Sequence, residues 1–154
     1  MRKRLIAPTP STRTRSSLDL EHAAVVEVTS EDHDFPVELA FAPEDARGWR
    51  AAVPGSQTIR LIFDRPQRLR HVCLIFEETE TARTQEFVLR WSSDDGSSLK
   101  EIVRQQWNFS PPGSIREVEE YQVDLCNVNV LELTIKPEIG GGPAHASLKN
   151  LRLS

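Results

Sequence analysis

The sequence predicts an all-β protein built as an antiparallel sandwich or barrel. Apolar residues alternate with polar residues in several short runs, most regularly between Gln57 and Gly96. Residues typical of turns separate these runs at regular spacing. No stretch combines the length and the periodicity of about 3.6 residues that an amphipathic helix requires. Period-2 runs bounded by turns are typical of half-buried antiparallel strands.

Eight or so short strands are expected where this pattern is clear. In chain order they are residues 24–29, 57–63, 72–76, 87–91, 99–107, 116–125, 128–136 and 147–153. Residues 36–41 are expected to form a short strand or a turn. Turns at Asp64–Gln67 and Ser93–Gly96, and an acidic loop at Glu77–Glu80, separate the central strands. Alternate apolar side chains of each strand are expected to form the core.

Length and composition indicate a single globular domain. With 154 residues, 38% apolar and 27% charged, the chain is long enough to bury a core. No apolar run approaches the roughly 20 residues that span a bilayer. Pro8 and Pro10, rather than an apolar segment, follow the basic start Arg2–Arg4, so we expect no secretory signal and a cytoplasmic location. Cys73 and Cys126 are expected to be free thiols.

The charge is distributed unevenly along the chain. Residues 1–17 carry five basic residues and no acidic one, although the net charge of the whole chain is −4. This segment lacks a periodic apolar pattern, so we expect a flexible basic arm ahead of one folded domain at residues 18–154. A basic arm can contact nucleic acid. The acidic body repels phosphate, and a nucleic-acid partner is therefore not expected.

Strand alternation predicts that the longer loops gather at one end of the sandwich. Antiparallel succession places the brief connections at one end, at residues 64–70, 92–98 and 124–128. It places the longer loops at the other end, at residues 42–56, 77–84, 107–114 and 137–146. Binding residues concentrate on such loops because a rigid scaffold holds them. The candidate ligand-binding residues are Trp49, Glu78, Glu80, Arg83, Trp107, Asn108 and His145.

The aromatic and charged candidates each have a structural and a functional interpretation. Trp49 and Trp107 either pack against loops, which is the preferred interpretation, or offer an aromatic face to a sugar. Arg83 either forms a salt bridge that holds the neighbouring acidic loop or clamps ligand hydroxyls or a carboxylate. His33 and His145 lie far apart in the sequence and are expected to be solvated rather than to bind a metal.

Several segments, taken in order, resemble one family. Gly48-Trp49 followed by Gln57–Leu61 is similar to the family's Trp and the strand after it. Arg83–Gly96 is similar to a later strand and its Ser-x-Asp-Gly turn, and Leu131–Ile135 to the penultimate strand. Over roughly residues 25–154 the chain thus resembles the discoidin family of galactose-binding-like domains. The resemblance implies a jelly-roll β-sandwich that binds carbohydrate or, inside cells, acts as an adaptor.

The chain also departs from this family. No cysteine lies near either end, where secreted discoidin domains usually join their termini through a disulfide. The turn before Trp49 lacks the usual Asp-Gly. Structural calcium, which many carbohydrate-binding relatives hold, needs six to eight oxygen ligands. The candidates for such a site are Asp32, Asp34, Glu44 and Asp45, and no other cofactor is expected.

Catalysis finds no support in the sequence. It contains no nucleophile elbow and no context for a Ser-His-Asp or Cys-His arrangement. Adjacent acids such as Glu119-Glu120 point to opposite faces of a strand and cannot face each other. We therefore expect a non-catalytic binding module that pairs an aromatic face with polar side chains. A carbohydrate is the first candidate ligand, and a protein partner bound by an intracellular adaptor domain is the alternative. The sequence does not predict the oligomeric state.

Overall fold

The computed structural model describes residues 2–4, 23–42 and 47–154. Its elements are almost entirely strands, as the sequence predicts. They are β1 (Arg2–Arg4), β2 (Ala24–Val28), β3 (Trp49–Arg50), β4 (Gln57–Glu77), β5 (Arg83–Ser92), β6 (Lys100–Phe109), β7 (Arg116–Lys136), β8 (Ser147–Leu148) and β9 (Asn150–Leu153). Residues 37–40, expected as a strand or turn, instead form the 3-10 helix η1 (Val37–Ala40). Among the described residues, no helix has the length and apolarity needed to cross a bilayer.

Two long bent strands, β4 and β7, belong to both layers of the sandwich. Their first layer follows the order β1-β2-β4-β7-β5-β6, and β9 adds to the second half of β4. The prediction of a turn at Asp64–Gln67 was wrong, because β4 continues through it with a shift in register against β7 between Ile62 and Gln67. The predicted break at residues 125–128 is likewise a bend within β7, where Asn127 has a φ of 57°.

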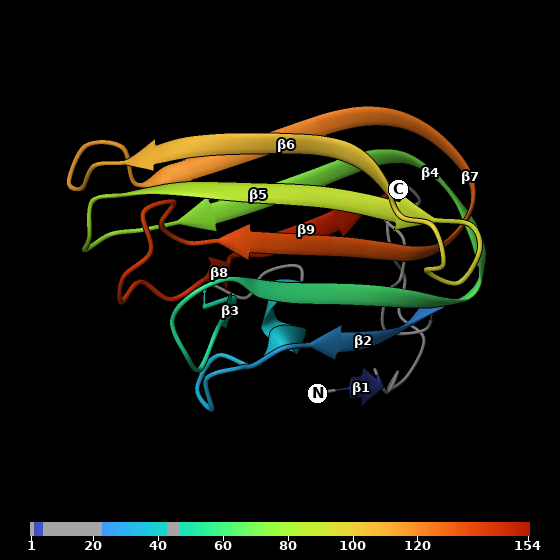
Figure 1. Cartoon of the computed structure of the whole chain (residues 1–154), viewed down its shortest axis with the longest axis horizontal. Helices are drawn as coiled ribbons and strands as arrows, with labels where there is room; N and C mark the ends of the chain where they lie inside the picture. Colours follow the sequence, from blue (N-terminus) through green and yellow to red (C-terminus); the bar gives the residue numbers. More distant parts are fainter. Residues whose placement is uncertain (1, 5–22, 43–46) are drawn as a thin grey trace.

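The two bends preserve the predicted placement of the loops. Figure 1 shows β4 and β7 curving back at the same end of the sandwich as the connection between β5 and β6. The connections β4–β5, β6–β7 and β7–β8 lie at the opposite end, as does the segment that leads from β3 into β4. A small separate ladder, in which β3 pairs with β8, also lies toward this end. We call it the loop end.

The core lies between the two layers and contains the apolar side chains that alternation predicts. Ile59 and Leu61 from β4, Leu133 from β7 and Phe87 from β5 are all at most 2% exposed. The rings of Phe76 and Phe87 join the two layers with their centroids 5.2 Å apart. Burying each such side chain contributes about 1.5–3 kcal/mol, so these contacts hold the layers together and fix the strands that carry the loops.

One part of β7 faces the opposite way from the expected pattern. Val118 is the apolar residue at the start of this strand, but it is 48% exposed. Glu117 is fully buried instead, at 0% exposure, and is the partner of Phe76 across the ladder with β4. Strict alternation from Tyr121 places residue 117 inward, so the inward position is set by register rather than by hydrophobicity.

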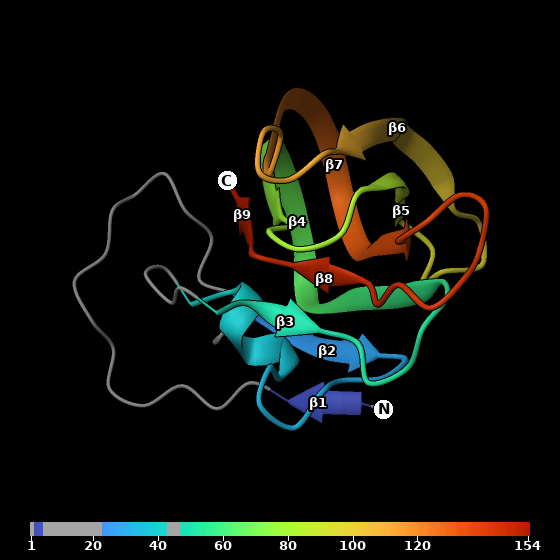
Figure 2. The same cartoon turned by 90° about the vertical axis from the view of Figure 1, so that its left-hand side faces the viewer.

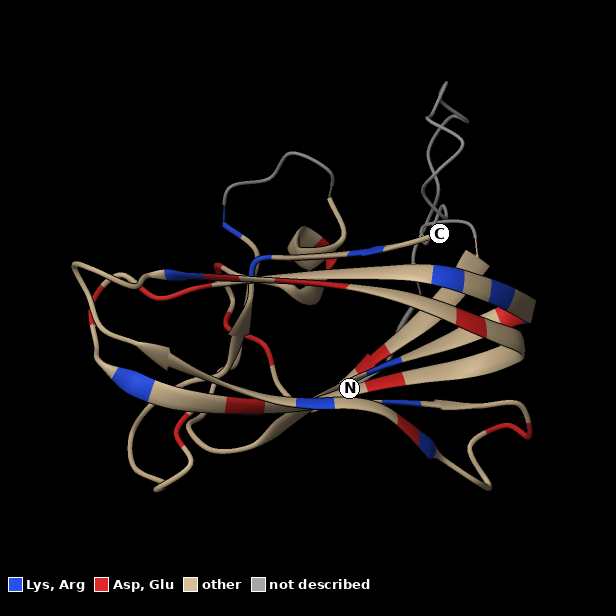
Figure 3. Cartoon of the chain, turned by 90° about the horizontal axis from the view of Figure 1, so that it is seen from above, with Lys and Arg blue, Asp and Glu red and all other residues tan. Residues whose placement is uncertain are grey.

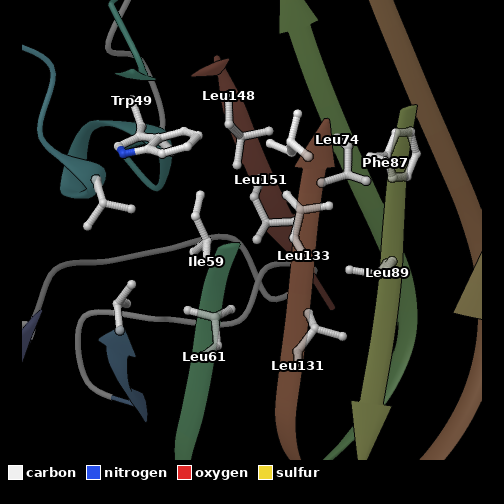
Figure 4. Packing of buried hydrophobic residues seen from close by; sticks show 14 of the residues in the cluster. Trp49, Ile59, Leu61, Leu74, Phe87, Leu89, Leu131, Leu133, Leu148 and Leu151 are labelled. Atoms are coloured by element: carbon white, nitrogen blue, oxygen red, sulfur yellow. The ribbon is translucent and has the colours of Figure 1, made fainter. Parts of the chain in front are cut away.

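Charged residues of both signs are interspersed along the strands (Figure 3). Glu132, expected to face out, is on the outer face but only 6% exposed. Arg60 donates to its Oε2 from Nη2 at 2.7 Å, and Arg90 lies 3.9 Å from its Oε1. These pairs cover the carboxylate, which explains its low exposure.

The N-terminal segment and the two cysteines also bear on predictions from the sequence. Arg2–Arg4, within the segment predicted as a flexible arm, form β1 antiparallel to β2. Residues 5–17 lie outside the described residues, and the rest of the arm stays a prediction. Cys73 and Cys126 are free thiols, as expected. Burial raises the pKa of the Cys73 thiol, which keeps it in the unreactive neutral form.

Candidate functional site

A cavity of about 320 Å³ opens at the loop end. One wall is the β3–β8 ladder and the other is the acidic loop that follows β4 (Figure 2). Its lining is mostly polar and charged. The lining residues are Phe35, Arg47, Trp49, Arg50, Glu77, Glu78, Thr79, Glu80, His145, Ser147, Leu148 and Lys149.

The β3–β8 ladder decides which side chains face this cavity. Trp49 pairs with Leu148, and both are buried in the core at 1% and 0% exposure. The indole Nε1 of Trp49 donates to the carbonyl of Ser30 at 3.0 Å. Because neighbours along a strand point to opposite faces, the next pair, Arg50 and Ser147, faces the other way. The ladder therefore presents a guanidinium and a hydroxyl side by side at the cavity.

Gly48 allows the chain to enter this ladder. Its φ is +70°, and a Cβ there would lie 2.6 Å from the carbonyl oxygen of Leu148. Only glycine satisfies both constraints, because a side chain would be strained by the backbone angle and would collide with backbone. The Gly48-Trp49 pair singled out in the sequence is thus a structural device that closes β3 against β8.

His145 is held at the cavity by its backbone and its ring. Its Nδ1 lies 3.0 Å from the carbonyl oxygen of Ala51. A carbonyl only accepts, so Nδ1 is the donor of this hydrogen bond and Nε2 is the other ring nitrogen. On either side of it, Ala51 donates to Ala146 at 2.9 Å and Gly55 donates to Ala144 at 3.3 Å. The imidazole is therefore a preorganised hydrogen-bonding group.

The opposite wall is an acidic loop with most of its charge already paired. Glu78 accepts from Arg83 Nε at 2.7 Å and from the amides of Glu80 and Thr81 at 3.0 and 3.3 Å. Burial raises the pKa of Glu78, but these hydrogen bonds outweigh it and the pKa lies below its usual value. Lys149 Nζ lies 3.3 Å from Glu77 Oε1. The exposed Glu80 is the carboxylate that this loop leaves open to solvent.

Arg83 lies beneath this loop and not in the cavity. Only 5% of it is exposed, and its Nη1 donates to the carbonyl of Pro137 at 2.8 Å and to Gln85 Oε1 at 3.2 Å. Its guanidinium carbon lies 4.9 Å from the ring centre of Phe109. These contacts match the salt-bridge interpretation: Arg83 ties the acidic loop to β5 and to the start of the β7–β8 loop.

The chain of buried polar groups continues inward from Arg83. Gln85 Nε2 donates to Glu117 Oε1 at 3.2 Å. Burial, together with a hydrogen bond to Glu119 and its charge, raises the pKa of Glu117 to about 9. Tyr121 donates to Glu119 at 2.9 Å, and burial followed by these acids raises the pKa of Tyr121. With this pKa, Glu117 keeps its proton at pH 7.

Four of the seven sequence candidates line the cavity, namely Trp49, Glu78, Glu80 and His145. Three do not, namely Arg83, Trp107 and Asn108. Trp107 is partly buried against the core, and Asn108 accepts from the hydroxyl of Thr84 at 2.7 Å on the outer side of β5 and β6. A role of these three residues in binding stays a prediction.

Sequence reasoning missed several residues of this lining, chiefly Phe35, Arg50, Ser147 and Lys149. Arg50 follows directly from alternation once Trp49 is known to point inward. A strand of only two residues gives too little pattern to reveal this. Phe35 is half-buried and supplies the aromatic side chain at the rim that the two tryptophans were expected to supply.

A metal centre finds no support within the part of the chain that the structure describes. There, no group of three or more His, Cys, Asp or Glu side chains is placed to hold an ion. Asp32, one calcium candidate, uses Oδ1 to accept from the amide of Asp34 at 2.9 Å. Glu44 and Asp45 lie outside the described residues, so the calcium prediction is untested.

Comparison with solved structures identifies the architecture. A family 32 carbohydrate-binding module of AlyQ, in complex with 4,5-unsaturated mannuronic acid, has a TM-score of 0.62 and 15% sequence identity over 84% of this chain and 92% of its own. The F5/8 type C domain of a Bacteroides fragilis protein has a TM-score of 0.62 and 14% identity over 90% and 94%. The chain has the discoidin-like, galactose-binding-like fold. This confirms the jelly-roll sandwich expected from the sequence.

Other solved structures with this fold carry different ligands. The family 32 module from Clostridium perfringens NanJ, in complex with galactose, has a TM-score of 0.62 and 11% identity over 84% of this chain and 92% of its own. No protein-family model matches the sequence, and no curated protein does either. Identities this low establish the discoidin-like fold alone. The function must be argued from the cavity.

Proposed function

We propose that this chain is a non-catalytic carbohydrate-binding module whose ligand lies in the cavity at the loop end. The observation that carries the proposal is the lining, where the polar residues Arg50, Ser147, His145 and Glu80 surround one hollow together with Phe35. Sugars are bound by such groups because their hydroxyls need both donors and acceptors, and their CH faces pack on aromatic rings.

The donors and acceptors are held in place before a ligand arrives. The β3–β8 ladder positions Arg50 and Ser147, and the Ala51 carbonyl orients His145. Arg83 and two backbone amides fix the Glu78 side of the cavity. Preorganisation reduces the entropy lost on binding, so a small polar ligand gains affinity here that a mobile loop would not provide.

The fold neighbours support a sugar as the ligand, since several solved structures that share it are carbohydrate-binding modules. A contiguous exposed apolar patch marks many protein-binding surfaces. In the described ranges, the exposed large hydrophobic residues are scattered: Val53, Leu99, Val118 and Ile139. They lie on two loops at the loop end, a turn at the other end and the outer face of β7, and so the sugar is favoured.

A glycan array followed by calorimetry tests the proposal. We expect millimolar or tighter binding of at least one sugar. Arg50→Ala should weaken this binding about tenfold or more, because a hydrogen bond to a charged group contributes about 1.5–3 kcal/mol. The thermal stability of this variant should be unchanged. Arg65→Ala is the matched control, since Arg65 is an exposed arginine at the bend of β4. Absence of sugar binding, or equal loss in both variants, contradicts the proposal.

A further inference from the structure

A second cavity of about 230 Å³ lies beside the first at the loop end. Its lining differs in character, because glycines, Pro137, Ile139 and Ala144 make most of its wall. The lining residues are Gly55, Ser56, Lys136, Pro137, Glu138, Ile139, Gly140, Gly141, Gly142 and Ala144. The volume is below the roughly 300 Å³ at which pockets for larger ligands begin, so it suits one small ring.

A single thin partition separates the two cavities. Ala144 lines the second cavity and the next residue, His145, lines the first. Consecutive Cα atoms lie about 3.8 Å apart, which is less than the length of one sugar ring. Gly55 also touches both sides, because it lines the second cavity and forms a bridge with His145. The two cavities therefore adjoin along this short stretch of chain.

The far wall of the second cavity is fixed to the sandwich. Ile139 donates to the carbonyl of Thr84 at 2.9 Å, and the amide of Thr84 donates to Glu138 Oε2 at 3.2 Å. Gly141 donates to Glu138 at 2.9 Å and has a φ of +84°. These hydrogen bonds tie the glycine-rich loop to β5, the strand that Arg83 links to the first cavity. Both cavities are thus built on one rigid support.

The chemistry of the second wall complements the first. Ile139 is 45% exposed although it is a large apolar residue. Gly140–Gly142 present backbone rather than side chains, which allows a flat ring to approach closely. Lys136 supplies a cation among the lining residues. A ring held here would pack its CH face on the apolar wall while its hydroxyls meet backbone groups.

We propose that the second cavity is a subsite for the next unit of a glycan chain whose first unit occupies the first cavity, so that the protein selects oligosaccharides over monosaccharides. This inference rests on the proposed function and deepens it. It assigns Ile139, Ser56 and the glycine-rich loop to ligand binding, although none of them was among the sequence candidates. The second unit is linked to the first and loses little further translational entropy when it binds, so affinity rises with chain length.

Calorimetry of the full chain with length series tests this subsite. The probes are galactose, galacturonic acid and N-acetylglucosamine, each as the monomer and as its 1,4-linked di-, tri- and tetramer. For the sugar that binds, we expect a gain of about tenfold or more from monomer to dimer. Ser56→Trp, which fills the second cavity from an exposed position, should abolish that gain and leave monomer affinity unchanged.

Two further variants keep the test decisive. Ser97→Trp places the same bulk on the exposed turn at the opposite end and should retain the gain. Ile139→Asp should also reduce the gain in affinity from monomer to dimer, because it replaces the apolar wall with a charge and adds no bulk. This variant tests the subsite even where Ser56→Trp does not fold. Monomer binding with no gain from chain length, or a gain that survives both cavity variants, overturns the subsite but leaves the proposed function standing. Failure of every probe to bind overturns the proposed function and the subsite together.

Discussion

Replacing Glu117 with glutamine is expected to stabilise the protein, by an amount that grows with pH. Glu117 has no exposed surface and a pKa of about 9, against 4.5 for an ordinary glutamate. Between these two values the unfolded chain releases the proton and the folded chain keeps it, so folding loses stability as pH rises. Each pH unit costs about 1.4 kcal/mol, and the cost at pH 7 is up to about 3 kcal/mol.

Glutamine is a close match for the neutral acid that the fold requires. Its amide oxygen can accept from Gln85 as Glu117 Oε1 does at 3.2 Å, and its NH₂ group can donate toward Glu119. The groups facing residue 117 are Glu119 and Tyr121 on β7 and Arg83 and Gln85 on β5. None of them is removed by the substitution, so the variant isolates the ionisation of one carboxyl.

Urea denaturation at several pH values between 4.5 and 8 measures the effect. The free energy of unfolding of Glu117→Gln minus that of the wild type should rise from near zero at pH 4.5 to as much as about 3 kcal/mol at pH 7. Glu120→Gln, an exposed neighbour on the outer face of the same strand, is the control and should show little change. A difference for Glu117→Gln that does not vary with pH would refute this account of the buried acid.

Two other substitutions test the supports of the cavity. Arg83→Ala should destabilise the protein by about 2–4 kcal/mol in urea denaturation, because it leaves a largely buried Glu78 without its partner. The pKa of Glu78 lies below its usual value of 4.5, so this loss should shrink as pH falls below 4.5, and a constant loss would contradict the ion pair. Gly48→Ala should lower stability by more than about 2 kcal/mol through strain and collision with Leu148. Gly140→Ala, whose Cβ would meet only the side-chain Oε1 of Glu138 at 3.9 Å, should be nearly neutral in the same urea denaturation.

The sequence predicts most of the core because alternation within a strand shows which side chains lie on the same face. Ile59, Leu61, Leu133 and Ile135 are all buried where the pattern places them. Pairing across the sandwich is not encoded in the same local way. Pro66 was expected to end a strand, since proline cannot donate to a ladder. It sits instead where β4 shifts register against β7, and the missing donor is not needed there.

The candidate site was only partly predictable for a different reason. Loop residues can be assigned to an end of the sandwich by counting strands, and this brings Glu78, Glu80 and His145 to the cavity. Whether a side chain faces inward depends on a ladder of two pairs, which buries Trp49 and exposes Arg50. A buried glutamate at position 117 runs against hydrophobicity, and the strand register, which pairs it with Phe76, sets its inward position.

An NMR titration of ¹⁵N-labelled protein with the sugar selected by the glycan array shows directly whether the sugar binds in the first cavity. If it does, the largest changes in amide chemical shift are expected at four residues that line this cavity: Arg50, Glu80, His145 and Ser147. No change is expected at residues 92–98, which form the turn at the opposite end. Shift changes centred on that turn or on an outer sheet face, with the cavity unaffected at saturating sugar, would contradict it.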